Sequence, residues 1–226
     1  LDTHPDLRIL IAPDHYTTAH DIARLSQALI HDFPREYAVY SQKEFTFNGI
    51  RQHNRNSLLW KDPAIDGIKT GHHSAAGYCL AASAKRGDQR LITVVMGNSS
   101  ENQRAVDSQA LLNWGFRFYE SHRLYEANKS LATPKVWKGD ANLVQVGVAE
   151  PLLVSTPRGK YSQLKASMDL PKSLVAPIAK GQKIGMVKVA LDGKVIAQSP
   201  LVALNAVEEG GFFKRLWHEL LMWWQD

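Results

Sequence analysis

The residues best suited to chemistry lie in one short stretch, Asp66–His72, which contains the tripeptide Lys69-Thr70-Gly71. A lysine ammonium and a threonine hydroxyl at the edge of a strand can both donate hydrogen bonds to a carboxylate. The glycine allows a ligand to come close to the backbone. A three-residue match recurs by chance, however, and taken alone it more often marks an exposed turn with a solvated lysine.

Other reactive residue types form weaker patterns. The single cysteine, Cys79, excludes an internal disulfide framework and a cysteine-based zinc site, and it is expected to be a small apolar residue within a strand. His15 and His20 are five residues apart and His72 and His73 are adjacent, but neither pair has metal-binding partners at a suitable spacing. We therefore expect no metal and no cofactor.

The composition is that of a globular protein. The chain has 226 residues, of which 44% are hydrophobic and 22% charged. No apolar run reaches the roughly 18 residues of a membrane-spanning helix. The net charge of +5 suits an anionic surface such as phospholipid but is too weak to indicate nucleic acid. Since Leu1 is not methionine and no signal peptide follows it, we expect a processed chain or a fragment.

Two strands are expected to follow the Lys-Thr-Gly stretch. Tyr78–Ala84 and Leu91–Met96 are apolar runs joined by a turn at Lys85–Asp88, which predicts a β-hairpin. A helix should follow, with Ser100 as N-cap and Gln103 completing the capping box. Its apolar stripe is expected to comprise Val106, Leu111, Trp114 and Phe118.

The residues before Asp66 predict a helix and short strands. Thr18 and Asp21 form a capping-box pattern, and Pro34 should end the helix. The apolar face of this helix would contain Ile22, Leu25 and Leu29. Leu7–Ala12 is expected as a short strand, and Phe45–Ile50 is strand-like with a turn at Asn48-Gly49.

Residues 122–207 have a different texture, with proline, glycine and short alternating runs that predict a small all-β sandwich. Asp192-Gly193 is a strong hairpin turn. The expected strands are Val144–Val148, Leu152–Ser155, Lys183–Leu191, Val195–Gln198 and Leu201–Leu204.

The last segment predicts an amphipathic helix. Lys214, Arg215, His218 and Glu219 fall on one side when the segment is plotted as a helix, and the pattern follows a Gly-Gly pair. Such a helix could pack on the protein's own core, but aromatic residues opposite basic ones favour a position in a membrane interface. The anchoring residues would be Phe212, Phe213, Leu216, Trp217, Leu220, Trp223 and Trp224.

Several motifs together carry a family resemblance. They are His15–Ala19, Phe45–Asn56, Asp66–His72, Ala76–Tyr78, Val95–Gly97, Asn113–Arg117, Pro157–Gly159 and Pro200–Val202, followed by the amphipathic tail. With them, residues 14–226 resemble the low-molecular-mass D-alanyl-D-alanine carboxypeptidases, the penicillin-binding protein 5 and 6 group. The resemblance implies a serine peptidase that removes the terminal D-alanine from peptidoglycan pentapeptide stems and is acylated by β-lactam antibiotics. It also implies a peripheral location on the periplasmic face of the bacterial inner membrane, on its phospholipid surface.

The resemblance assigns roles to the residues of the Lys-Thr-Gly strand. Lys69 matches the catalytic lysine of this motif, which supports the electrostatics around the nucleophile. Thr70 matches the hydroxyl that binds the terminal carboxylate of the substrate. Gly71 would let the substrate lie against the strand, and His72 follows it as in the family.

Two arginines gain a role from the same resemblance. Arg104 matches the arginine that completes the carboxylate site, and a guanidinium suits a carboxylate because it can bind both oxygens. Arg55, in Asn54-Arg55-Asn56, matches an arginine beside the cleft. Without the resemblance, either arginine would be taken for a solvated surface charge.

The family's Ser-x-x-Lys and Ser-x-Asn motifs should precede the Lys-Thr-Gly strand, but neither occurs in residues 1–68. Ser162–Lys165 and Ser100–Asn102 have these spellings but follow Lys69, and Ser100 is better explained as a helix cap. The nucleophilic serine and its lysine are therefore missing from this chain. We expect the chain to be a fragment that is inactive alone.

The predicted fold is α+β. Residues 1–120 would form the C-terminal part of a β-lactamase/transpeptidase-like domain, 121–208 a β-sandwich, and 209–226 the amphipathic anchor helix. The favoured function is part of a serine-type D-Ala-D-Ala carboxypeptidase. The alternative is a non-catalytic, membrane-anchored cell-wall or protein-interaction module, and a β-lactamase is less favoured because such enzymes need neither the β domain nor the tail.

The missing Ser-x-x-Lys leads to a direct prediction. Incubation of this chain with a labelled penicillin, followed by mass spectrometry, should show no covalent mass increase. A stoichiometric adduct on Ser162 or any other serine would contradict the fragment interpretation.

Overall fold

The Lys-Thr-Gly stretch lies in β3 (Ile65–His73), an outer strand of a three-stranded antiparallel sheet ordered β3-β4-β5. The structure is a computed structural model that describes residues 16–225. The chain divides into two units, residues 1–118 and 119–226, and each is considered by itself. The predicted strand at Leu7–Ala12 lies outside the described residues.

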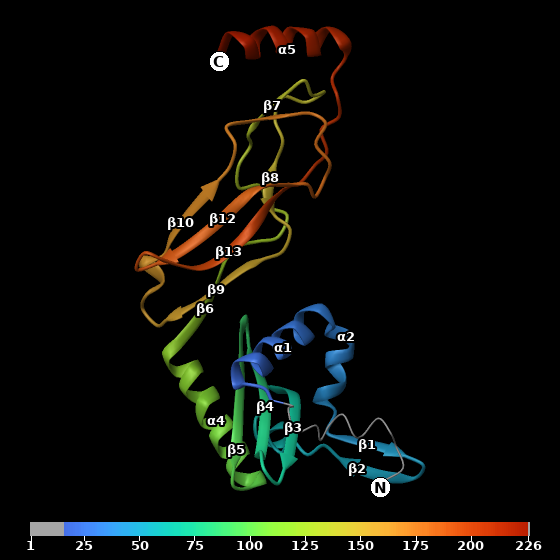
Figure 1. Ribbon diagram of the computed structural model, residues 1–226, viewed down its shortest axis with the longest axis vertical. Coiled ribbons are helices and arrows are strands. Elements are labelled where there is room, and N and C mark those ends of the chain that lie inside the picture. The colour runs from blue at the N-terminus through green and yellow to red at the C-terminus, as the bar shows by residue number, and fades with distance from the viewer. Residues whose placement is uncertain (1–15, 226) are drawn as a thin grey trace. The chain divides into compact units, whose positions relative to one another are not determined.

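The first unit combines this sheet with helices and a separate hairpin (Figure 1). In chain order its elements are α1 (Ala19–Asp32), α2 (Pro34–Tyr37), the 3-10 helix η2 (Ala38–Ser41), β1 (Glu44–Phe47), β2 (Ile50–His53), α3 (Leu58–Lys61), β3, β4 (Gly77–Arg86), β5 (Gln89–Asn98) and α4 (Glu101–Phe118).

The predicted hairpin after the Lys-Thr-Gly stretch is confirmed as β4 and β5, whose register ends at the pair Arg86 and Gln89. The turn is therefore shorter than predicted, and Gly87 enters it with a φ of 59°, a conformation that glycine adopts easily. The turn at Asn48-Gly49 is also confirmed, since both residues have positive φ between β1 and β2.

Side chains alternate across β4 and give the sheet two covered faces. Leu80, Ala82 and Ala84 belong to the core that contains residues of α4. Ala81 belongs to a second core with Tyr37, against which side chains of α1 pack. The sheet is thus covered by α4 on one face and by α1 and its neighbours on the other.

The first helix begins and ends as predicted. The Thr18 hydroxyl accepts a hydrogen bond from the Asp21 amide at 3.1 Å, and the Asp21 carboxylate accepts one from the Thr18 amide. Such reciprocal capping satisfies two backbone donors that the first turn leaves free. The helix stops at Asp32, and Pro34 starts α2. Leu25 is the exception on the apolar face, because it remains exposed.

The start of α4 is confirmed, but its predicted apolar stripe is wrong. Ser100 caps the helix through a 3.1 Å bond from the Gln103 amide. The stripe residues are all exposed, and a different side of the helix is buried, one that includes Ala105, Ser108 and Gly115. The reason is a close approach to the sheet: a Cβ added at Gly115 would lie 2.6 Å from the Leu91 side chain. The exposed residues are Val106, Leu111, Trp114 and Phe118, and the buried ones are Arg104, Ala105, Ser108, Leu112, Gly115 and Phe116.

The second unit contains β-strands followed by one helix. Its elements are β6 (Tyr119–Tyr125), β7 (Lys135–Trp137), β8 (Val146–Val148), β9 (Leu152–Pro157), the 3-10 helix η3 (Tyr161–Gln163), β10 (Lys165–Asp169), β11 (Ser173–Val175), β12 (Lys183–Leu191), β13 (Lys194–Ala203) and α5 (Phe212–Gln225). They form a four-stranded sheet ordered β10-β12-β13-β8 and the pairs β11-β7 and β6-β9.

A valine-rich core holds these sheets together. Val136 of β7, Val146 of β8, and Val187 and Val189 of β12 are each fully buried in it. β-branched side chains suit such positions because they pack well on a pleated surface. The predicted turn at Asp192-Gly193 is confirmed, since both residues have positive φ between β12 and β13. The two runs predicted at Val195–Gln198 and Leu201–Leu204 are one continuous strand, β13.

The C-terminal helix is confirmed as α5, and with it the predicted α+β fold. Within residues 16–225, no helix combines the length and apolar character needed to cross a membrane. The side chains of Trp223 and Trp224 lie outside the described residues. The domain boundaries predicted at 120 and 208 stay a prediction.

The packing of α4 predicts opposite results for two adjacent leucines. Leu112 is 0% exposed and Leu111 is 46% exposed. Leu112→Ala should lower the free energy of unfolding by about 2–5 kcal/mol because it leaves a cavity. Leu111→Ala, the matched control, should change it by less than about 0.5 kcal/mol. Urea unfolding followed by circular dichroism measures both, and equal losses would contradict this orientation of α4.

Candidate functional site

The Lys-Thr-Gly residues present different faces along β3. Lys69 is exposed, and its Nζ donates a hydrogen bond to the Thr70 carbonyl oxygen at 2.6 Å. The Thr70 side chain is nearly buried, with 9% exposure. Gly71 lies opposite Cys79 of β4, and a Cβ there would make only an ordinary contact at 3.7 Å. Neither backbone strain nor crowding in the described structure therefore requires a glycine at position 71, and its role in substrate access stays a prediction.

Arg104 reaches β3 from the first turn of α4. Its side chain is 3% exposed, and its Nη1 and Nη2 donate to the carbonyl oxygens of Gly71 at 3.3 Å and Arg55 at 3.5 Å. Glu101 Oε1 lies 3.5 Å from Nη2. The structure thus brings Arg104 beside the Lys-Thr-Gly strand, with two nitrogens directed at backbone carbonyls. The Arg55 side chain is exposed, and its proposed role beside the cleft stays a prediction.

Asn56 is a supporting residue that the sequence pattern did not single out. It is 1% exposed, and its Nδ2 donates to the Gly67 carbonyl oxygen at 2.9 Å, which ties residues 54–57 to β3. Asn54 in turn accepts a bond from the Asn56 amide at 3.0 Å. Two asparagines close together, as in Asn54-Arg55-Asn56, have side-chain amides that can bond the backbone. The sequence could not signal that one of them reaches across to β3.

A partly buried polar network holds the beginning of β3. The Asp66 carboxylate accepts hydrogen bonds from the Tyr37 hydroxyl at 2.7 Å and from Arg90 at 2.9 Å, and Arg90 also donates to Ser83 Oγ at 2.6 Å. Burial raises the pKa of Tyr37 above its ordinary range, and the adjacent Asp66 carboxylate acts in the same direction. Tyr37 therefore stays a neutral donor to Asp66, and the network joins α2, β3, β4 and β5.

An aromatic contact lies at the other end of β3. The His72 and Tyr78 rings are 4.0 Å apart between centroids with an interplanar angle of 31°. The Arg104 guanidinium carbon lies 5.5 Å from the centroid of the same tyrosine ring. His72 and Arg104 therefore both contact Tyr78.

An apolar groove of about 400 Å³ runs between α1 and the sheet, with Lys69, Thr70 and Gly71 in its wall. Other lining residues include Ile22, Leu25, Leu29, Cys79, Ala81 and Met96. Cys79 is half-buried within β4, as expected for a small residue in a strand. A groove that joins apolar walls to a few polar groups is typical of ligand sites.

Polar side chains of the C-terminal helix α5 contact the strands and loops of the second unit, called the β unit below. The Lys138 amide donates to His218 Nδ1 at 2.7 Å, and Lys214 Nζ donates to the Asp140 carbonyl oxygen at 2.9 Å. Lys138 also pairs with Glu219. Desolvation, aided by Lys214 and by Lys135, lowers the pKa of His218. Three of the side chains on the predicted polar side of this helix, Lys214, His218 and Glu219, thus bind the second unit.

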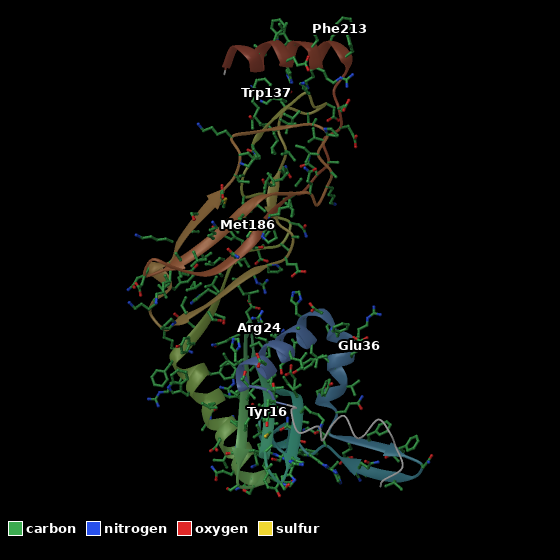
Figure 2. The ribbon with its side chains drawn as sticks, viewed as in Figure 1. Tyr16, Arg24, Glu36, Trp137, Met186 and Phe213 are labelled. Atoms are coloured by element: carbon green, nitrogen blue, oxygen red, sulfur yellow. The ribbon has the colours of Figure 1, made fainter. Side chains whose placement is uncertain are left out.

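The aromatic side of α5 is exposed. Phe213 is 84% and Trp217 62% exposed, and Phe212, Leu216 and Leu220 are exposed as well. Figure 2 shows Trp137 and Phe213 on opposite sides of the α5 ribbon, and Trp137 makes an edge contact with the His218 ring at 5.2 Å. The helix therefore presents aromatic side chains outward while its polar side is occupied.

Comparison with known proteins gives the family. Residues 7–100 match the family described as D-alanyl-D-alanine carboxypeptidase, and residues 119–209 match the C-terminal domain of penicillin-binding protein 5. Together the two matches include β3, with its Lys-Thr-Gly sequence, and strands β6 to β13 of the second unit.

The chain belongs to the D-alanyl-D-alanine carboxypeptidase family. It is 48% identical over 215 residues to the Escherichia coli K12 D-alanyl-D-alanine carboxypeptidase DacC, a match that covers 94% of the chain and 54% of that protein. It is 47% identical over 209 residues to DacA of the same strain, covering 92% of the chain and 52% of that protein. The chain thus spans about half the length of the curated carboxypeptidases it matches.

A solved structure of this family has a similar fold. Penicillin-binding protein 5 from Haemophilus influenzae matches with a TM-score of 0.73 and 46% identity, over 88% of the chain and 58% of that structure. A Streptococcus pneumoniae structure described as a peptidoglycan synthesis regulatory factor matches with a TM-score of 0.68 at 20% identity, over 85% of the chain and 57% of that structure, which supports the fold alone.

Proposed function

We propose that this chain contributes the Lys-Thr-Gly half of a serine-type D-Ala-D-Ala carboxypeptidase. The observation that carries the proposal is that Lys69 and Thr70 lie on β3 and Arg104 binds the same strand, in a member of the carboxypeptidase family. The substrate would be the pentapeptide stem of peptidoglycan, and β-lactam antibiotics would acylate the same enzyme. Residues 1–120 would belong to the peptidase domain, 121–208 to the β domain and 209–226 to an anchor.

The proposed chemistry assigns binding rather than nucleophilic attack to these residues. The hydroxyl of Thr70 and the guanidinium of Arg104 would hold the free terminal carboxylate. Lys69 would contribute positive charge near the reacting carbonyl, while Gly71 and His72 would line the peptide's path and Arg55 the rim of the cleft.

The nucleophile would come from sequence outside these 226 residues. A serine oxygen would attack the D-Ala-D-Ala carbonyl, the terminal D-alanine would leave with its nitrogen protonated, and water would release the acyl-enzyme. Two observations support a nucleophile from outside these residues: no Ser-x-x-Lys precedes Lys69, and the chain matches only about half the length of its relatives. The protein in which these residues act would then hold both halves.

The proposed carboxylate site can be tested in a complete homologous enzyme carrying this half. Thr70→Val and Arg104→Ala should each remove a charge-assisted contact of roughly 1.5–3 kcal/mol and slow carboxypeptidase turnover about ten- to a hundredfold. Penicillin acylation should fall less. Val106→Ala, at an exposed position of the same helix, is the control and should change neither rate. Equal losses for peptide and penicillin would argue that these residues hold the fold instead.

We further propose that α5 attaches the protein to the periplasmic face of the inner membrane as a peripheral anchor. The exposed aromatic side of α5 supports this, because indole and phenyl rings favour the boundary between headgroups and acyl chains. The polar side has partners on the β unit, so insertion of the outer side would leave these contacts in place. The charges of Lys214 and Arg215 are offset by Glu219 and Asp226, so apolar burial should dominate binding.

Vesicle binding tests the anchor. The chain should co-sediment with vesicles of phosphatidylethanolamine and phosphatidylglycerol, and added salt should weaken binding only modestly. Truncation after Glu209 should abolish binding while the β unit stays folded by circular dichroism. A Phe213→Ser/Trp217→Ser variant should weaken binding with the helix still present. If the truncated chain still co-sediments, or if it unfolds, α5 is part of the fold and not an anchor.

A further inference from the structure

We propose that Tyr78 is a positioning residue that holds both His72 and Arg104 at the end of the Lys-Thr-Gly strand. This inference rests on the proposed function. In the proposed carboxylate site, contact with the Tyr78 ring would fix the direction of the Arg104 guanidinium. Tyr78 itself would touch neither the substrate nor the reacting atoms.

The ring of Tyr78 has two partners from different elements. His72 of β3 lies directly across the ladder from Tyr78 of β4, and their rings stack at 4.0 Å. Arg104, from the first turn of α4, lies with its guanidinium carbon 5.5 Å from the same ring centroid. This distance is within the roughly 6 Å at which a cation is attracted to an aromatic ring. A single ring therefore links the end of β3 to the start of α4.

The other contacts of Arg104 hold it less closely. Its hydrogen bonds to the carbonyls of Gly71 and Arg55 are 3.3 and 3.5 Å long, beyond the usual N–H···O distance of about 2.9–3.0 Å. Its ion-pair partner Glu101 also lies at 3.5 Å and is largely exposed to solvent. A guanidinium that is 3% exposed needs better support than these bonds give. The Tyr78 ring supplies packing and cation–π attraction at once.

Tyr78 is well suited to be the fixed member of this group. It is half-buried in the middle strand of the sheet, where it pairs with His72 on β3 and with Asn98 on β5. The strands on both sides therefore determine the position of its backbone. His72, by contrast, is exposed near the end of β3. Arg104 has a long side chain that extends from helix α4. Because the Tyr78 ring is fixed by the sheet, its contacts restrict the positions of the His72 and Arg104 side chains.

The experiment compares the 226-residue chain with Tyr78→Phe, Tyr78→Leu and Tyr161→Leu by NMR without any ligand. Tyr161→Leu is the matched control, because Tyr161 stacks on His122 in the second unit with nearly the same geometry, 4.1 Å and 33°. In the wild type and Tyr78→Phe, ring-current shifts should move the His72 ring protons upfield and the Arg104 Nε–H signal should be sharp. In Tyr78→Leu both signatures should be lost.

Tyr161→Leu should move the His122 ring protons alone. Melting curves of all variants check that each is folded. If Tyr78→Leu is folded and keeps both the His72 and the Arg104 signatures, the proposal is wrong. If Tyr78→Leu does not fold, Tyr78→Phe tests the proposal. This variant keeps the ring without its hydroxyl and must show both the His72 and the Arg104 signatures. Their loss would overturn the proposal.

A second readout connects the ring to the carboxylate site. N-acetyl-D-alanine, a probe with a free carboxylate, is titrated against each variant while the Thr70 amide signal is followed. The wild type and Tyr78→Phe should bind equally, and Tyr78→Leu should bind about tenfold more weakly because the guanidinium is no longer oriented. Equal binding by folded Tyr78→Leu would overturn the proposal. If the wild type does not bind the probe, the proposed carboxylate site fails, and the ligand-free spectra still decide whether Tyr78 positions Arg104.

Discussion

The first unit depends on how β3 is held. In residues 16–225 this strand pairs with β4 alone, so its other edge has no ladder to fix it. Side chains from outside the sheet supply the missing constraint. Asn56 bonds the Gly67 carbonyl, Arg104 the Gly71 carbonyl, and the Asp66 side chain joins Tyr37 and Arg90. An outer strand held this way keeps its position although only one of its edges is paired, and a strand with an unpaired edge is the kind that a peptide can join by strand addition.

These constraints explain why so many polar groups are buried near one strand. A buried amide or guanidinium is costly unless each donor finds an acceptor. Here the acceptors are backbone carbonyls of β3 and of residues 54–57, so satisfying the side chains also fixes the strand. Asn56 and Arg104 thus bond the strand that contains Lys69, Thr70 and Gly71, and the Tyr78 ring adds to the support of the guanidinium.

In the second unit the unusual feature is α5, whose apolar side is exposed. Its valine core is complete without the aromatic side chains of α5 that the structure describes. The polar side of α5 is bound by Lys138 and the Asp140 carbonyl, which leaves Phe213 and Trp217 outside. This is the reverse of an ordinary surface helix, whose apolar stripe faces the core.

Local features were predictable because they depend on neighbouring residues. The capping box at Thr18, the Ser100 cap and the turns at Asn48-Gly49 and Asp192-Gly193 use backbone groups or φ angles within a few positions. The motifs around Lys69 likewise indicated the family, because their spelling and order along the chain are properties of the sequence itself.

What the sequence could not determine was which side of each helix faces inward. On α4 hydrophobicity favoured Val106, Leu111, Trp114 and Phe118, but the side of the helix that contains Gly115 lies close to Leu91 and is the buried one. The roles of Asn56 and Tyr78 likewise depend on partners from other elements. The sequence alone thus determined the long helices, the main hairpins, the caps at Thr18 and Ser100 and the family, because these follow from local patterns and motif spelling. Only the tertiary structure decided which residues face inward and which support β3, because both depend on how closely distant segments approach.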